Sequence, residues 1–368
     1  MNLVKTNRET LLKPLQAVSG IIERRHTLPI LSNVLLQRTD SKVSFVATDI
    51  EIEITAEVQV EGPGESRGVT VGARKLLDIL RALPDTAEIT LALQDKRLQV
   101  KSGKSRFNLQ TLPPEDFPRM SAPEGGGVAF SMPQGALKAL LALVQYAMAQ
   151  QDIRYYLNGL LMVVDGSQLK VVATDGHRLA FASRQLESDL GMQEVILPRK
   201  TILELAKLLS DGDAPVEIRL AANQARFAFD GVLLVSKLVD GKFPDYTRVI
   251  PQNHPKLLKI GRIVLQQSLS RAAILTSDKF RGVRWMLSPG SLKISSTNTE
   301  QEEAQEELDV DYAGDTLDIG FNVGYLLDVL ANVDTDEIEC ALGDASSSAL
   351  ITVPGRPDFK YVVMPMRI

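Results

Sequence analysis

One short stretch of this 368-residue chain brings several reactive side chains together: "TDGHR", at Thr174–Arg178. A carboxylate beside an imidazole is the combination that acid–base catalysis and nucleophile activation use. On an extended strand, Asp175 and His177 would point to the same side, where a hydroxyl such as that of Ser183 could join them. One interpretation of the sequence is therefore a hydrolase that uses Asp175 and His177.

Other catalytic, cofactor and metal signatures fail when they are tested residue by residue. A phosphate-binding loop needs G-x-x-x-x-G-K-[ST], but the sequence before Gly241 has Ser236 at the first glycine, and Phe243 stands where Ser or Thr should be. Cys340 is the only cysteine, and the three histidines are far apart in the sequence, which excludes the usual metal-ligand spacings. We expect no catalytic residue, no metal site and no cofactor.

The surroundings of "TDGHR" recur in the chain. "VATD" occurs at Val46–Asp49 and again at Val172–Asp175, inside longer matching segments that begin at Leu28 and Ile153. A third copy begins at Lys279 and has Ser-Thr-Asn in place of "VATD". Since both "VATD" copies carry the aspartate but only the second continues with Gly-His-Arg, the shared aspartate belongs to the repeat architecture. This argues against catalysis.

The flanking elements repeat as well. Apolar residues at helical spacing predict amphipathic helices over 73–83, 198–209 and 322–333, and a second helix opens each repeat over 9–25, 133–150 and 262–276. Between them, short segments alternate apolar and polar residues around polar turns, which indicates antiparallel hairpins. We expect an α+β protein of three similar domains, each with two helices packed on antiparallel sheets.

Linkers rich in proline and glycine divide the repeats. "APEGGGVAF" lies near Gly126 and "PQNHPK" near Pro251. The expected domains are residues 1–123, 128–251 and 252–368.

Charge is distributed unevenly along the chain. The six expected helices together carry a net charge of +7, although the whole chain carries −5. The helices could simply present solvated faces, or they could line one surface that meets a polyanion without reading its sequence. No helix-turn-helix or zinc-finger pattern is present. We found no apolar stretch long enough for a membrane helix and no signal peptide, so we expect a cytoplasmic protein.

These features together resemble the bacterial DNA polymerase III beta subunit family, the sliding clamps, over the whole chain. The most specific matching segments are "RYYLNGLL", "ATDGHRLA", "KFPDYTRVIP", "KFRGVRW" and "YVVMPMRI". The resemblance implies the DNA clamp fold, with three domains forming a crescent and a homodimer closing a six-domain ring around duplex DNA. It also implies a non-enzymatic processivity factor of the replicative DNA polymerase III holoenzyme. A DNA-binding module that never encloses its ligand remains the other alternative.

The resemblance further implies the partners of the ring. They are double-stranded DNA without sequence preference, a second copy of the chain, and proteins that carry short clamp-binding peptides of the Gln-Leu-x-Leu-Phe type. Such proteins are the replicative polymerase alpha subunit, the clamp loader delta subunit, translesion polymerases, mismatch-repair proteins and ligase.

The resemblance assigns three groups of residues. The residues implied for DNA contact are basic or lie at the rim: Arg24, Arg25, Arg74, Lys75, Gln151, Tyr155, Tyr156, Arg199, Lys200, Arg271 and Arg281. The residues implied for the partner peptide form an apolar site with polar edges: Leu157, Thr174, Gly176, His177, Arg178, Leu179, Pro244, Arg248, Val249, Val362, Met364, Pro365 and Met366. The residues implied for the dimer interface combine opposite charges with an apolar centre: Lys104, Arg106, Phe107, Leu109, Ile274, Leu275, Glu300, Glu302 and Glu303.

Two of these assignments have alternatives or qualifications. Leu157, Val249 and Val362 could be ordinary core residues rather than peptide contacts. Because the third repeat lacks "VATD" and its last helix is near neutral, we expect its contribution to DNA contact to be weak.

Overall fold

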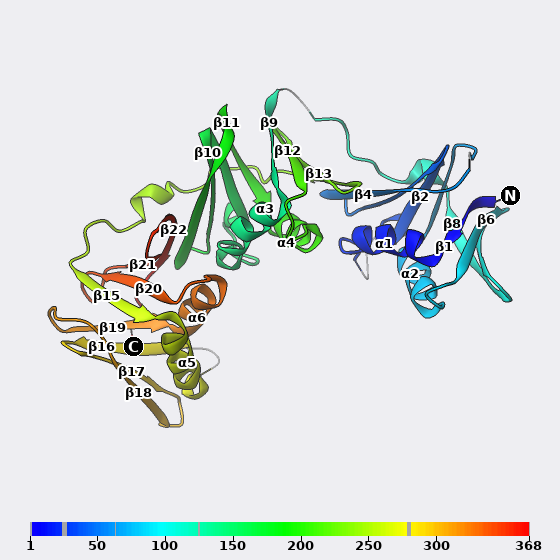
Figure 1. Cartoon of the computed structure of the whole chain (residues 1–368). Coiled ribbons are helices and arrows are strands. Elements are labelled where there is room, and N and C mark those ends of the chain that lie inside the picture. Colours follow the sequence, from blue (N-terminus) through cyan, green and yellow to red (C-terminus); the bar gives the residue numbers. More distant parts are fainter. Residues whose placement is uncertain (1, 24–27, 63, 124–125, 278–280, 368) are drawn as a thin grey trace. The chain divides into compact units, whose positions relative to one another are not determined.

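The computed structural model describes residues 2–23, 28–62, 64–123, 126–277 and 281–367, and Figure 1 shows its elements. Its contacts divide it into two compact units: Met1–Ala136 with Leu203–Leu238, and Leu137–Ile202 with Val239–Ile368. Both units combine antiparallel sheets with a few helices, which confirms the predicted α+β class.

The first unit is built on a 12-stranded sheet with the order β1-β6-β7-β8-β5-β2-β3-β4-β14-β13-β12-β9. Its strands are β1 (Asn2–Asn7), β2 (Asn33–Thr39), β3 (Lys42–Thr48), β4 (Ile52–Gln59), β5 (Arg67–Gly72), β6 (Glu88–Gln94), β7 (Arg97–Ser102), β8 (Ser105–Leu112), β9 (Gly127–Pro133), β12 (Pro215–Ala221), β13 (Gln224–Phe229) and β14 (Val232–Lys237).

The second unit contains two sheets, a 6-stranded one with the order β10-β11-β22-β21-β20-β15 and a 4-stranded one with the order β18-β17-β16-β19. Their strands are β10 (Gly159–Thr174), β11 (Arg178–Pro198), β15 (Lys256–Gly261), β16 (Gly282–Ser288), β17 (Ser291–Thr297), β18 (Glu303–Asp309), β19 (Leu317–Asn322), β20 (Glu337–Leu342), β21 (Ala349–Val353) and β22 (Arg356–Val363). One of the predicted polar turns, "VDGSQ" at residues 164–168, lies inside β10, where Gly166 has a φ of 59° and the register with β11 shifts.

The helices are α1 (Arg8–Ser19), α2 (Ala73–Ala82), α3 (Gln134–Ala142), α4 (Arg199–Leu208), α5 (Arg262–Ala272) and α6 (Val323–Asn332). The predicted ends of α2, α4 and α6 are correct to within one residue. The other three helices are shorter than predicted. Beyond α3, for example, Val144 and Ala147 stay fully buried although the backbone has left the α-helix. The apolar pattern therefore reports burial and not where the helix ends.

Neighbouring repeats are joined by antiparallel strand pairing. In the first unit β4 pairs with β14, and Ile54 lies opposite Leu234. In the second unit β11 pairs with β22, and Leu179 lies opposite Val362. β4 and β11 are the strands that follow the two "VATD" sequences. The chain therefore uses the same strand pairing between neighbouring repeats twice, and we call this pairing the joint.

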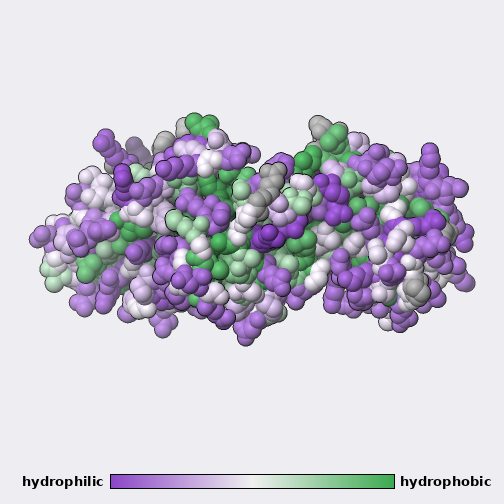
Figure 2. All heavy atoms as spheres, turned by 90° about the horizontal axis from the view of Figure 1, so that it is seen from above, coloured by the Kyte–Doolittle hydropathy of each residue, from purple (hydrophilic) through white to green (hydrophobic). Residues whose placement is uncertain are grey.

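The helices bury one face and present the other to solvent. On α2, Leu76 and Leu80 are fully buried, whereas Arg74 and Lys75 are exposed. Hydrophilic residues cover most of the face seen in Figure 2, and hydrophobic ones form small patches between them. Within the described residues, no helix is long and apolar enough to cross a membrane.

Candidate functional site

The reactive-looking stretch at Asp175 is a tight turn between β10 and β11, and not the extended strand that would align Asp175 with His177. Asp175 Oδ1 accepts hydrogen bonds from the backbone N–H groups of His177 (2.9 Å) and Arg178 (3.0 Å). Thr174 Oγ1 accepts from the Gly176 N–H (3.0 Å) and donates to the Arg178 carbonyl (2.6 Å). The carboxylate is engaged in shaping the backbone, which is the usual role of Asp in such turns.

The first repeat builds the same turn. Asp49 Oδ1 accepts from the N–H groups of Glu51 (3.0 Å) and Ile52 (2.8 Å). The residue after the aspartate has a positive φ in both copies, 78° at Ile50 and 88° at Gly176. The aspartate shared by the two "VATD" sequences is therefore a structural residue in both.

The third repeat keeps the acceptor but lengthens the turn. Asn298 Oδ1 accepts from the N–H groups of Glu300 and Glu302, both at 2.9 Å. An asparagine oxygen thus replaces the aspartate oxygen as the organiser of the backbone.

Arg178 is enclosed by groups of the second unit. Its side chain is only 10% exposed. Nε donates to Asp175 Oδ2 (3.1 Å), Nη1 to Asp328 Oδ2 (2.5 Å) and Nη2 to the Tyr146 carbonyl (2.7 Å). The guanidinium also lies 4.4 Å from the ring centroid of Tyr325. The resemblance places Arg178 in the partner-peptide site, and each of its three guanidinium nitrogens is already bound inside the chain.

Apolar residues of the implied peptide site share one cluster in the second unit. Leu157, Leu179 and Val362 are all nearly fully buried and pack together there. The alternative that Leu157, Val249 and Val362 are core residues is therefore right for Leu157 and Val362, but wrong for Val249, which is 45% exposed. Phe243 belongs to the same cluster, and Tyr246 packs against it. These contacts bring together the turn after β10, the end of β22 and the segment 243–250.

The exposed members of the implied peptide site lie on the same three segments. Apart from Arg248, they are Gly176, His177, Pro244, Val249 and Met364, and we call these five the candidate docking surface. The Met364 N–H donates to the His177 carbonyl (2.9 Å), so the C-terminal tail lies along the turn.

Other members of the implied set are less accessible or already paired. Thr174 is buried, and Pro365 and Met366 are half-buried. Arg248 is exposed and pairs with Asp245 at 3.0 Å.

The implied DNA-contacting residues fall into different environments. Arg74, Lys75, Gln151, Tyr155 and Arg281 are exposed, and Lys200 and Tyr156 are half-buried. Arg24 and Arg25 lie outside the described residues.

Two of these arginines are already engaged within the chain. Arg199 is half-buried, donates to the Met148 carbonyl (3.1 Å), and has a pKa that burial lowers. Arg271 donates to both carboxylate oxygens of Glu306, at 2.9 and 2.5 Å. Sequence alone could not foresee either contact, because the partners lie 51 and 35 residues away.

The implied interface residues lie on or near two strands that have an unpaired edge. Arg106, Phe107 and Leu109 are on β8 and Glu303 is on β18. Lys104, Glu300 and Glu302 lie in the turns before these strands, and Ile274 and Leu275 lie in the short 3₁₀ helix that follows α5. β8 pairs with β7 along its length but with β5 only at Thr111 and Leu112, and β18 pairs only with β17 among the described strands. Most of the implied interface residues are accessible: Lys104, Arg106, Glu300, Glu302, Glu303 and Ile274 are exposed, whereas Phe107, Leu109 and Leu275 are half-buried.

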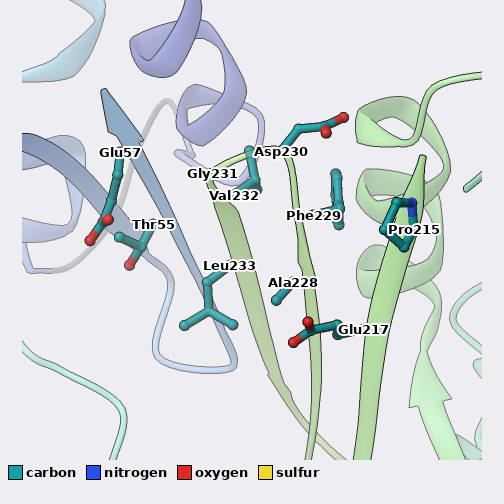
Figure 3. A pocket seen from close by; sticks show the side chains of 10 residues that line it. All are labelled: Thr55, Glu57, Pro215, Glu217, Ala228, Phe229, Asp230, Gly231, Val232 and Leu233. Carbon is teal, nitrogen blue, oxygen red and sulfur yellow. The ribbon is translucent and has the colours of Figure 1, made fainter. Parts of the chain in front are cut away.

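A separate hollow of about 500 Å³ lies over β4, β14, β13 and β12 (Figure 3). Its acidic residues include Glu57, which pairs with Lys42 (3.4 Å), and Asp230, which accepts from Gln134 Nε2 (2.9 Å). No histidine, cysteine or serine lines it. Across the described residues, no group of three or more His, Cys, Asp or Glu could hold a metal ion. Among its lining residues the hollow therefore has no Ser–His or Cys–His pair.

The fold and these sites together define a class: a repeated α+β chain in which the best catalytic candidate is a structural turn. Three family models match it, describing the N-terminal (residues 1–121), central (131–245) and C-terminal (247–367) domains of the DNA polymerase III beta subunit. The chain belongs to the DNA polymerase III beta subunit family.

Curated relatives agree over nearly the whole length. The beta sliding clamps of Pseudomonas putida and Escherichia coli K12 are 49% and 47% identical to it, each over 98% of both chains. The solved beta subunit of Pseudomonas aeruginosa is 48% identical over 100% of both chains, with a TM-score of 0.95. The same species' clamp has also been solved bound to griselimycin, with a TM-score of 0.95 and 48% identity over 99% of both chains.

This family is a non-catalytic processivity factor, so the chain is not an enzyme. The hydrolase interpretation of Asp175 and His177 is therefore wrong. The physical reason is that Asp175 and His177 lie in a tight turn, where the Asp175 carboxylate already accepts hydrogen bonds from the backbone N–H groups of His177 and Arg178.

Proposed function

We propose that two copies of this chain close head to tail into a ring that encircles duplex DNA and slides along it. We further propose that the ring tethers replication and repair proteins through short peptides. The observation that carries the ring is the joint used twice within the chain, β4 with β14 and β11 with β22. The corresponding strands left over are β18, which follows the turn of the third repeat, and β8, which ends the first.

Closure through β18 and β8 would satisfy two unpaired strand edges at once. A long exposed edge favours pairing with another chain, and head-to-tail pairing closes when the rotation per copy permits it. The charges are complementary, because β8 and its preceding turn carry Lys104 and Arg106, and β18 begins at the exposed Glu303. Ile274, 75% exposed in the short helix next to β18, supplies apolar surface beside that strand. One ring therefore needs two identical contacts.

The helices supply the sequence-independent contact with DNA. With the observed helix bounds their summed charge is again +7 against −5 for the chain. Contacts from lysine and arginine to phosphates give affinity without base recognition, which is what sliding requires. The exposed Arg74 and Lys75 on α2 are the best-placed candidates; Arg199 and Arg271 are weaker ones, because each already has a partner in the chain.

The candidate docking surface suits a short apolar peptide of the Gln-Leu-x-Leu-Phe type. Val249 and Met364 are each almost half exposed, and Met364 lies beside the polar turn of Gly176 and His177. Methionine adapts its shape to different partners, as a shared tethering site needs. We propose that the polymerase alpha subunit, the clamp loader, translesion polymerases, mismatch-repair proteins and ligase bind here, and that the protein works in the cytoplasm.

Retention on DNA tests enclosure directly. The clamp is loaded by its clamp loader onto nicked circular DNA, separated from free protein, and followed after a restriction enzyme linearises the circle. A ring stays on the circle and is lost from the ends of the linear form. Equal retention on both forms would support the non-enclosing alternative and refute the ring.

A further inference from the structure

We propose that Asp328 on α6 is a positioning residue for the candidate docking surface, and that it acts through Arg178. Asp328 was not among the residues that the sequence assigned to any site. The inference rests on the proposed docking function. It deepens that function by identifying the residue that positions the turn of Gly176 and His177 within the docking surface.

The geometry shows Arg178 as a bridge between two repeats. Its Nε is bound by Asp175, in the turn of the second repeat, and its Nη1 by Asp328, in the last helix of the third. Tyr325, under the guanidinium, is three residues before Asp328 and so lies on the same face of α6. One helix face therefore supplies both a carboxylate and an aromatic ring to one buried cation.

The turn that Arg178 stabilises also forms the polar part of the candidate docking surface. Gly176 and His177 lie between Asp175 and Arg178, and the His177 carbonyl accepts from the tail residue Met364. Arg154 Nη2 also donates to the Asp175 carbonyl (3.1 Å). The turn is thus fixed between one exposed arginine and one buried arginine.

Loss of the Asp328 carboxylate removes one of the two negative charges on Arg178. Arg178 is 10% exposed, so its Nη1 group has little access to water as a replacement partner. A buried charged donor that loses its partner is costly, and the side chain reorients to regain hydration. Movement of Arg178 shifts the backbone of the turn, because its own N–H and carbonyl are bonded to Asp175 and Thr174.

The strand pairing between β11 and β22 does not depend on Asp328, so the fold should survive the substitution. Five residue pairs, from Arg178 with Val363 to Ala182 with Phe359, join the two strands. The expected effect is therefore on peptide affinity, by about tenfold, which corresponds to about 1.4 kcal/mol. DNA retention should be unchanged.

The test compares four variants of the full-length clamp by fluorescence anisotropy with a labelled Gln-Leu-x-Leu-Phe peptide. Asp328→Ala and Asp328→Asn should weaken binding, with Ala the weaker, and Asp328→Glu should restore much of it. Asp318→Asn, which removes an exposed ion pair with Arg284 in the same unit, is the matched control and should bind normally. Thermal midpoints and the NMR signal of Arg178 Nε–H separate local repositioning from unfolding.

Three outcomes decide the question. A shifted Arg178 Nε–H signal, a native melting profile and weaker binding support the inference. Normal binding by both Asp328→Ala and Asp328→Asn overturns it, and so does equal weakening by Asp318→Asn. His177→Ala tests the docking surface itself: if that variant binds the peptide normally, the proposed docking function fails at this surface independently of Asp328.

Discussion

Asp175 and Asp245 organise two turns that share two contacts and differ strongly in burial. Each aspartate accepts a hydrogen bond from the N–H two residues later through Oδ1, and each pairs through Oδ2 with an arginine three residues later. The Asp175–Arg178 pair is 18% and 10% exposed, whereas the Asp245–Arg248 pair is 52% and 86% exposed. Substitution by asparagine keeps the Oδ1 acceptor and removes the charge in both places.

The buried turn should respond far more strongly. A hydrogen bond to a charged group contributes about 1.5–3 kcal/mol, and Asp175→Asn removes this charge assistance where water can replace it poorly. That range corresponds to roughly a ten- to hundredfold increase in local opening. Asp245→Asn should show no measurable change, because an exposed ion pair is screened by water and salt.

Hydrogen exchange followed by mass spectrometry can measure both responses in one protein. Peptides that cover residues 174–182 should exchange faster in Asp175→Asn, and those that cover 243–250 should be unchanged in Asp245→Asn. Local exchange is preferable to global unfolding, since a chain with several units need not unfold in two states. Equal effects at the two turns would refute the argument that burial of the Arg178 guanidinium decides the cost.

Three further predictions concern other parts of the chain. Arg106→Glu should weaken the dimer by about tenfold or more in sedimentation equilibrium, and Glu303→Arg in the same chain should restore much of it, because the two charges are proposed to face each other across the interface. A hydrogen bond from Arg271 lowers the pKa of Glu306 in the folded protein. The pair therefore stabilises the fold at pH values above the pKa of Glu306 in the unfolded chain, and this stabilisation is lost as the pH falls through the pKa of Glu306 in the folded protein. In Arg271→Ala, an NMR titration should give a higher Glu306 pKa. Burial raises the pKa of Cys340 to about 12, so a disulfide reagent should react with it only after unfolding; rapid reaction of the native protein would contradict its burial.

The repeat and its main elements could be predicted from the sequence because they depend on local patterns. Apolar spacing locates α2, α4 and α6, and the paired "VATD" sequences identify Asp49 and Asp175 as structurally equivalent. What the sequence could not predict are contacts between distant segments. Arg178 and Asp328 are 150 residues apart, and nothing in their spacing indicates that a β-turn and a helix will meet.

The negative charge of α6 illustrates that limit. From the sequence alone, the low net charge of this helix indicated only that the third repeat would contribute weakly to DNA contact. In the structure that charge is Asp328, and its carboxylate binds Arg178. A net charge summed over a helix therefore describes its long-range field, but not the partner of any one side chain.

One position in the turn differs between the repeats in its side chain and its role. It lies three or four residues after the Asp or Asn that organises the turn. In each repeat, the N–H of this residue is bound by the Asp or Asn oxygen, and the residue is Ile52, Arg178 or Glu302. Ile52 is 1% exposed and contributes to the core of the first unit. Arg178 becomes a buried bridge to the next repeat, and Glu302 stays exposed beside the free edge of β18. Because an Asp or Asn oxygen binds this N–H in all three repeats, the repeats share the organiser of the turn while the side chain at this position differs: a core residue in the first, a buried bridge in the second and an exposed residue in the third.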